Sequence, residues 1–169
     1  MPLLFCLILF PIIILANSFP EISGKTLSDK RIEIPNRTTH QLLILGFDMK
    51  SATPMEAWVR GLNLVPSPNI SWVQIPVIGP VPPFVDGFIK GGMKKSMPIE
   101  VQQTFFPYFG NKKFDILNSL QDSETLTDNV TPFIVILSSD GAIKFSKQML
   151  ATTKNIESVN QRVHQITQP

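Results

Sequence analysis

The sequence predicts an α/β domain whose mixed central sheet is covered by helices on both faces. Two continuous apolar runs, residues 42–47 (LLILGF) and 133–137 (FIVIL), are typical of strands that are buried on both sides. Strand and helix patterns alternate before the second run, and Asp140-Gly141 then predicts a hairpin that returns an antiparallel strand. Alternating units ahead of a hairpin indicate a three-layer α/β/α architecture with a mixed sheet.

The remaining elements follow from shorter patterns. Alternating or apolar segments predict further strands at residues 31–34, 70–77, 104–109 and 142–146. Apolar residues at helical spacing predict helices at residues 54–63, 84–93, 114–120 and 156–166. Gly87, Gly91 and Gly92 weaken the second of these helices, because glycine is a poor helix former.

The start of the first helix has a complete local signature. Thr53 is expected to be the N-cap, Pro54 suits the first helical position, and Glu56 would close a capping box. Residues 48–52 are then the loop between a central strand and a capped helix.

The N-terminal segment resembles a signal peptide. Met1–Ala16 carries no charged side chain, and the small residues Ala16 and Ser18 predict cleavage after Ser18. An uncleaved membrane anchor is the alternative, although the run is shorter than the roughly 20 residues that span a bilayer. We therefore expect residues 1–18 to be a leader or anchor and residues 19–169 to form one exported domain, periplasmic, secreted or held at the membrane. Cys6 is the sequence's only cysteine, so that domain has no thiol.

Several function classes find no support in the sequence. The net charge of +2 is spread along the chain, which argues against nucleic-acid binding. His40 and His164 lack metal-ligand spacing, and the sequence contains neither a phosphate-binding glycine loop nor a G-x-S-x-G elbow. We expect no metal, no cofactor and no enzymatic activity.

The order of elements resembles the thioredoxin-like superfamily. The strand at 42–47 ends where such proteins place their reactive loop and helix, and Thr131-Pro132 precedes the hairpin strand where they carry a cis-proline. The resemblance therefore implies a cis bond before Pro132.

A narrower resemblance rests on three segments taken in order. These are residues 19–27 (FPEISGKTL), 42–51 (LLILGFDMKS) and 88–94 (FIKGGMK). They are similar to the thioredoxin-like assembly factors of mitochondrial ATP synthase and their bacterial relatives. This resemblance implies a chaperone for a membrane subunit and not an oxidoreductase.

Two candidate binding segments follow. Asp48, Lys50, Ser51 and Thr53 lie at a helix N-terminus, where polar groups either satisfy backbone donors or form a polar binding surface. The hydroxyls of Ser51 and Thr53 are poor nucleophiles without a base. The resemblance implies that Thr131 presents its backbone to an extended peptide, and the alternative is a simple turn at Thr131-Pro132.

Two other segments have a structural and a functional interpretation. Lys90, Lys94 and Lys95 form a basic cluster, which is either a solvated helix face or a contact for an anionic membrane surface or an acidic partner. The aromatic residues at 105–109 are expected to pack in the core.

The sequence-based hypothesis is a redox-inactive binding module for a polypeptide or membrane-protein partner. The alternative is a glutathione-type enzyme that uses the thiol of a cofactor in place of its own cysteine. A third hypothesis is a structural protein tethered to the membrane by a retained leader.

Overall fold

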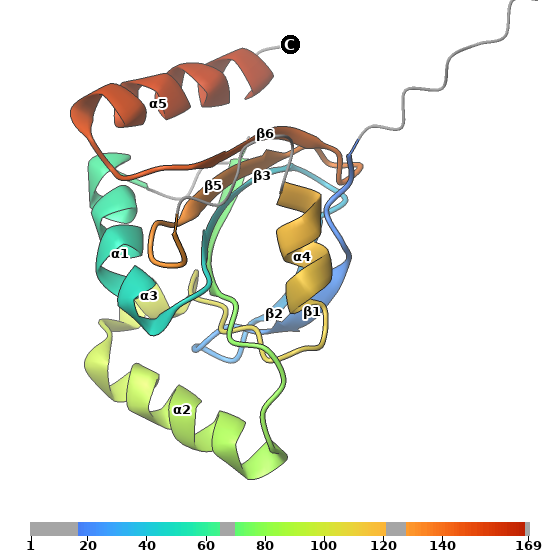
Figure 1. Cartoon of the computed structure of the whole chain (residues 1–169), viewed down its shortest axis with the longest axis vertical. Helices are drawn as coiled ribbons and strands as arrows, with labels where there is room; N and C mark the ends of the chain where they lie inside the picture. Colours follow the sequence, from blue (N-terminus) through green and yellow to red (C-terminus); the bar gives the residue numbers. More distant parts are fainter. Residues whose placement is uncertain (1–16, 65–69, 121–127, 168–169) are drawn as a thin grey trace, which may run out of the picture.

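The computed structural model describes residues 17–64, 70–120 and 128–167, which form two sheets and six helical elements (Figure 1). The strands are β1 (Ile22–Lys25), β2 (Arg31–Ile34), β3 (His40–Gly46), β4 (Ile70–Pro76), β5 (Phe133–Leu137) and β6 (Ile143–Gln148). The helical elements are the 3₁₀ turn η1 (Met49–Ser51), α1 (Ala52–Gly61), α2 (Pro83–Ser96), α3 (Ile99–Gln102), α4 (Lys113–Leu120) and α5 (Thr153–Thr167). The expected leader lies outside these residues except for Asn17 and Ser18.

The central sheet is mixed, as the sequence predicts. Its strand order is β4-β3-β5-β6, in which β3 is parallel to β4 and antiparallel to β5, and β6 is antiparallel to β5. The two continuous apolar runs form the central pair, with Leu43 opposite both Val73 of β4 and Val135 of β5. Strands β1 and β2 form a separate antiparallel hairpin.

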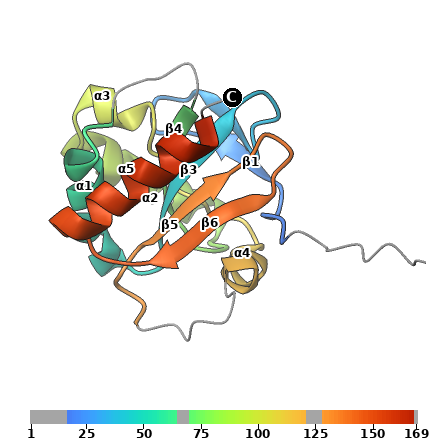
Figure 2. The same ribbon diagram turned by 90° about the horizontal axis from the view of Figure 1, so that it is seen from above.

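Helices cover both faces of this sheet, so the predicted three layers are present (Figures 1 and 2). Along β3, Leu42 and Ile44 point to one face, where they pack with Trp58 of α1 and Val159 of α5. The alternate residues of β3 point to the other face, where Ile116 of α4 and Ile34 of β2 complete the second core cluster.

The aromatic segment packs in the core, as expected. Phe105, Phe106 and Tyr108 are buried. The predicted strand at 104–109 is only partly formed, because the segment makes two isolated parallel bridges, Gln74 to Phe105 and Val77 to Tyr108. It therefore lies beside only the second half of β4.

Helix α2 forms where the apolar spacing predicts it, but it lies on the outside of the molecule. No residue of α2 is buried, and the side chains of Phe84 and Phe88 are 81% and 83% exposed. A Cβ atom added at Gly87 or Gly91 would meet no other atom within 4 Å. In the part of the chain that the structure describes, no helix combines the length and hydropathy needed to span a membrane.

Candidate functional site

The junction between β3 and α1 is ordered by a reciprocal pair of hydrogen bonds between Asp48 and the residues that follow it. The side-chain Oδ1 of Asp48 accepts from the Lys50 amide at 2.8 Å, and the Ser51 Oγ accepts from the Asp48 amide at 3.4 Å. Asp48 has the extended backbone of an N-cap, with φ −131° and ψ 154°. The pair Asp48 and Ser51 therefore forms the capping box, around the 3₁₀ turn that leads into α1.

The prediction that Thr53 and Glu56 cap this helix is wrong. The helical turn begins at Met49 and α1 at Ala52, so Thr53 already has helical backbone and cannot be an N-cap. Thr53 is exposed, and Glu56 instead pairs with Arg60 one turn later at 3.1 Å. Pro54 is tolerated in the first turn, because amides there have no intrahelical partner.

Ser51 joins the junction to the segment that precedes β5. Its side chain is fully buried, and its Oγ donates to the carbonyl of Asn129 at 3.3 Å. Gly46 allows this packing, because a Cβ there would lie 2.5 Å from the Met55 sulfur and 2.7 Å from the Ser51 Cβ. The structure thus brings together the two candidate segments that the sequence places 78 residues apart.

The segment before β5 is ordered by the carboxylate of Asp128. Its oxygens accept hydrogen bonds from the backbone amides of Val130 and Thr131 and from the Thr131 hydroxyl. These bonds, chiefly those from Thr131, lower the pKa of Asp128 below its usual 3.8. The Thr131 carbonyl accepts from the Gln148 Nε2 at 3.0 Å. Both backbone groups of Thr131 therefore already have partners within the chain.

The Thr131–Pro132 peptide bond is trans, which corrects the expected cis bond; the cis X-Pro bond in the described residues is Ile34–Pro35. The Pro132 carbonyl accepts from the Met149 amide at 3.1 Å and continues the pairing of β5 with β6.

Exposed apolar side chains surround this end of the sheet. Met49 in η1 is 95% exposed, and Leu150, just beyond β6, is 52% exposed. The start of α4 also lies here, since the Lys113 Nζ donates to the Phe47 carbonyl at 3.5 Å, and the adjacent Phe114 is 74% exposed. Lys50 lies next to Met49 and is exposed as well. We call these exposed apolar residues and the two neighbouring lysines the junction surface (Met49, Lys50, Lys113, Phe114 and Leu150).

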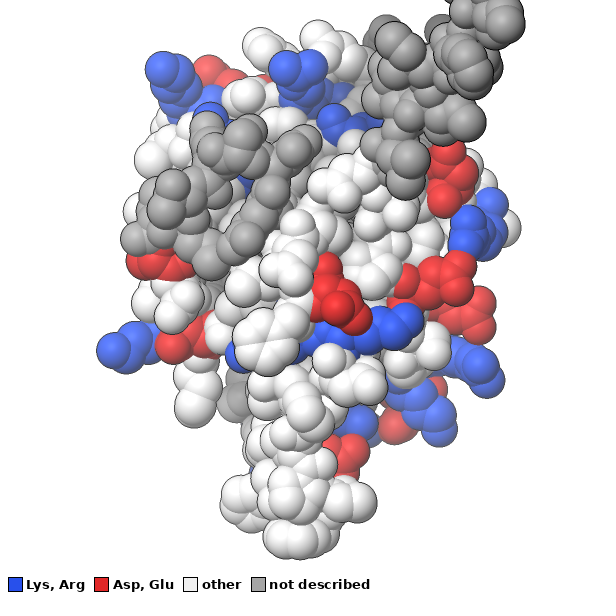
Figure 3. Space-filling model, turned by 45° about the vertical axis from the view of Figure 1, so that its right-hand side comes forward, with Lys and Arg blue, Asp and Glu red and all other residues white. Residues whose placement is uncertain are grey.

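The contacts of Lys90 and Lys94 in α2 are with residues outside the junction surface. Lys90 lies 3.6 Å from Asp86 and 5.3 Å above the Phe109 ring, and Lys94 lies 2.7 Å from Asp29. Lys95 is exposed. Figure 3 shows basic and acidic side chains interspersed over this side of the molecule, and an uncharged protrusion where Figure 1 places α2.

Neither histidine is placed to activate Ser51. His40 begins β3 and Ser51 follows the other end of that strand, which places them roughly 20 Å apart. His164 lies near the end of α5. Across residues 17–64, 70–120 and 128–167, no group of three or more histidine, cysteine, aspartate or glutamate side chains is close enough together to hold a metal ion.

Sequence reasoning missed Asp128 and Asn129, although Asp128 carries a recognisable signal. An aspartate two to three residues before the amides that it accepts is typical of an Asx turn. Asn129 contributes only its carbonyl, so no side-chain pattern identifies it.

Solved structures with the same fold are numerous, whereas no protein-family model and no curated protein matches the sequence. A putative electron transport protein from Aquifex aeolicus is 15% identical, with a TM-score of 0.60 over 88% of this chain and 96% of that one. The exposed lipoprotein thioredoxin of Streptococcus pneumoniae is 6% identical, with a TM-score of 0.56 over 86% and 99%. The thioredoxin domain of a thiol-disulfide oxidoreductase from Bacteroides vulgatus is 12% identical, with a TM-score of 0.54 over 88% and 96%. The chain therefore has a thioredoxin-like fold.

Proposed function

We propose that this protein is a polypeptide-binding module that uses the thioredoxin-like scaffold without a thiol of its own. The observation that carries the proposal is the chemistry of the β3–α1 junction. Asp48 and Ser51 have the spacing of a Cys-x-x-Cys pair, but they carry a carboxylate and a hydroxyl that are bonded to the backbone. These hydrogen bonds hold the Asp48 and Ser51 side chains against the backbone of the β3–α1 junction.

The state of Ser51 argues against a hydroxyl-based enzyme. The side chain is fully buried, its Oγ is bonded to Asp48 and Asn129, and His40 is at the far end of β3. A serine becomes a nucleophile only when an adjacent base accepts its proton. A ligand at the junction would therefore contact the exposed residues around Ser51.

The junction surface favours an extended polypeptide with apolar side chains. Met49, Phe114 and Leu150 together present a thioether, an aromatic ring and an aliphatic chain to solvent. Methionine adapts its shape to different apolar partners. Lys50 and Lys113 at the margin suit acidic residues or lipid headgroups beside an apolar segment. The similarity of three sequence segments to membrane-subunit assembly factors agrees with such a client, which we propose to be a membrane protein.

The proposal is tested with a thiol-free unfolded polypeptide, reduced and carboxymethylated lactalbumin. We expect the protein to bind it, and Met49→Asp to weaken binding at least tenfold, because the charge removes the most exposed apolar contact. Phe84→Asp is the matched control, since Phe84 is also a highly exposed apolar residue but lies on α2, and the change should leave binding unchanged. Binding that is insensitive to Met49→Asp contradicts the proposal.

The rival is an enzyme that borrows the thiol of a cofactor such as glutathione. Insulin reduction with and without glutathione distinguishes the two. We expect no activity above the glutathione background, because the domain contributes no thiol.

We also propose that the protein is exported, on the pattern of residues 1–18. The Phe19 amide donates to the Gly141 carbonyl at 3.0 Å, so a chain that begins at Phe19 keeps its first residue in the fold. Determining the N-terminus of the mature protein is the test. A chain that starts at Phe19 is expected, and one that keeps residue 1 supports the tethered alternative.

A further inference from the structure

Within the described residues, the first half of β4 has no neighbouring strand at its outer edge. The Gln74 amide donates to the Thr104 carbonyl and the Gln74 carbonyl accepts from the Phe106 amide, both at 2.8 Å. Gln74 therefore directs its backbone groups away from β3. Because backbone direction alternates along a strand, Trp72 and Ile70 direct their amides and carbonyls to the same outer side.

These four outward groups lie before the point where the neighbouring segment begins to pair with β4. The segment that pairs with Gln74 begins at Thr104, and the chain before it turns into α3, which ends at Gln102. Within the described residues, the outward groups of Ile70 and Trp72 form no hydrogen bond. Among the described residues, the buried indole Nε1 of Trp72 and amide Nε2 of Gln74 also lack a hydrogen-bond partner.

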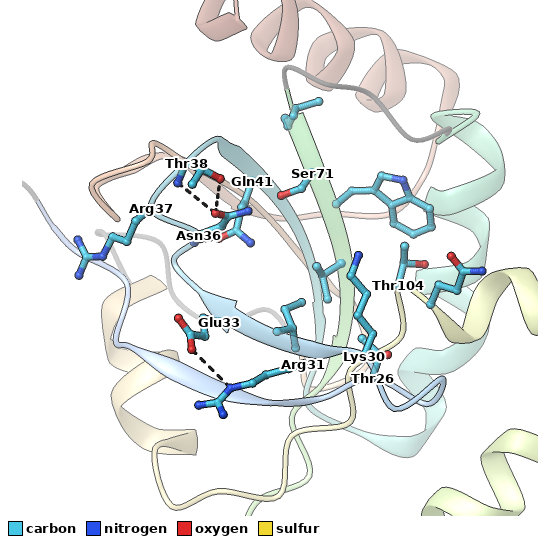
Figure 4. A pocket seen from close by; sticks show the side chains of 15 residues that line it. Thr26, Lys30, Arg31, Glu33, Asn36, Arg37, Thr38, Gln41, Ser71 and Thr104 are labelled. Carbon is cyan, nitrogen blue, oxygen red and sulfur yellow. Dashed lines mark hydrogen bonds and ion pairs between the residues drawn. The ribbon is translucent and has the colours of Figure 1, made fainter.

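A groove of about 680 Å³ follows this open edge, between β4 and the hairpin strand β2 (Figure 4). Ser71 and Trp72 form one wall, Thr104 lies at one end, and Lys30 and Glu33 belong to the opposite wall. An extended segment in this groove would lie beside the outward backbone groups of Ile70 and Trp72, which both line it. The volume of the groove is in the range of ligand-binding clefts.

Three cationic residues line this groove, namely Lys30, Arg31 and Arg37. Arg31 lies 3.6 Å from Glu33, and Arg37 pairs with Glu21 outside the groove. Figure 4 shows Arg37 directed away from the groove, whereas Lys30 is among the residues that line it. Lys30 forms no ion pair with any residue whose placement the structure describes.

We propose that this groove binds an extended peptide segment of a partner protein, which adds as a strand to Ile70–Trp72 and places an acidic side chain beside Lys30. Strand addition would pair the four outward backbone groups, and a carboxylate suits the ammonium group of Lys30. The proposal goes beyond the junction surface, because none of the groove residues belongs to that surface.

The test uses the full chain and a fluorescein-labelled pentapeptide of threonine, valine, glutamate, valine and threonine. We expect polarisation to report binding. A peptide with N-methylated backbone amides should bind at least tenfold more weakly, because it cannot donate to the strand edge. A peptide with lysine in place of glutamate should also lose at least tenfold. Equal binding of the N-methylated peptide, or no binding of the acidic peptide at about 1 mM, would overturn the proposal.

Two protein variants locate the contact. Lys30→Glu is expected to weaken binding at least tenfold, whereas Lys154→Glu, an equally exposed change on α5, should leave it unchanged. Ile70→Pro removes one outward amide at the first strand position, where proline is tolerated, and Ile70→Val keeps that amide as the control. A concentration-dependent dimer that Ile70→Pro dissociates would assign the edge to a second copy of the chain and overturn the proposal of a partner peptide.

Discussion

The Ser51 hydroxyl donates a hydrogen bond to the carbonyl of Asn129, which ties the start of α1 to the segment that leads into β5. The same oxygen accepts from the Asp48 amide, so one buried side chain connects both candidate segments. This arrangement explains how the junction is ordered without a disulfide. It also leaves the exposed residues around it as the surface that a partner can contact.

Removing the Ser51 hydroxyl should destabilise the protein. Ser51→Ala leaves the Asp48 amide and the Asn129 carbonyl without this partner, and we expect a loss of about 1–3 kcal/mol in the free energy of unfolding. Urea denaturation measures it. Ser158→Ala, on the exposed face of α5, should change stability by less than about 0.5 kcal/mol and serves as the control. Equal effects of the two variants would contradict the role of Ser51.

The position of the helix cap makes a second prediction. Asp48→Ala should lower the free energy of unfolding by about 1 kcal/mol, because the Lys50 amide loses its acceptor. Thr53→Ala should change it by less than about 0.5 kcal/mol, since Thr53 is exposed and caps nothing. A larger loss of stability for Thr53→Ala than for Asp48→Ala would contradict this assignment and identify Thr53 as the N-cap.

Two glycines should respond in opposite directions to the same change. Gly46→Ala would place a methyl group 2.5 Å from the Met55 sulfur, and we expect a loss of about 1–3 kcal/mol. Gly91→Ala meets nothing within 4 Å in the exposed helix α2 and should raise stability by about 0.5–1 kcal/mol. Thermal unfolding of both variants is the measurement, and destabilisation by Gly91→Ala would show that α2 packs against another surface.

Acidic pH should reduce the stability that the Asp128 carboxylate gives to the fold through the segment before β5. Hydrogen bonds from Thr131 and Val130 lower the folded-state pKa of Asp128 below 3.8, so the ionised carboxylate stabilises the fold above the unfolded-state pKa. That contribution is lost as the pH falls through the lowered folded-state pKa, below about pH 4. Asp128→Asn should therefore be less stable than the wild type at pH 7 and show a smaller loss of stability on acidification. Parallel pH profiles for the two proteins would contradict this role.

The sheet could be predicted because short stretches of sequence are enough to identify its strands and its hairpin turn. The continuous apolar runs of β3 and β5 and the turn pair Asp140-Gly141 identify the central pair and the hairpin from sequence alone, and Gly141 has the positive φ (+89°) that such a turn needs. Helix α5 likewise follows from its apolar stripe, which buries Val159 completely.

The errors arise where a distant residue decides between local patterns. Residues 48–56 contain two possible capping boxes, and in the one that forms, Ser51 also bonds to Asn129 from a distant part of the chain. The apolar spacing of α2 predicts a helix but cannot show that Phe84 and Phe88 have no surface to cover. The open edge of β4 depends on where the segment at 104–108 stops pairing, which is a property of the fold.

The central claim is that a polypeptide binds at the junction surface without thiol chemistry. Nuclear magnetic resonance titration of the ¹⁵N-labelled protein with reduced and carboxymethylated lactalbumin tests it most directly, because it locates the contact on the backbone. We predict that the largest shifts fall on Met49, Lys50, Phe114 and Leu150, and that Met49→Asp abolishes them. Shifts confined to the groove beside β4, or no shifts at all, would contradict the account.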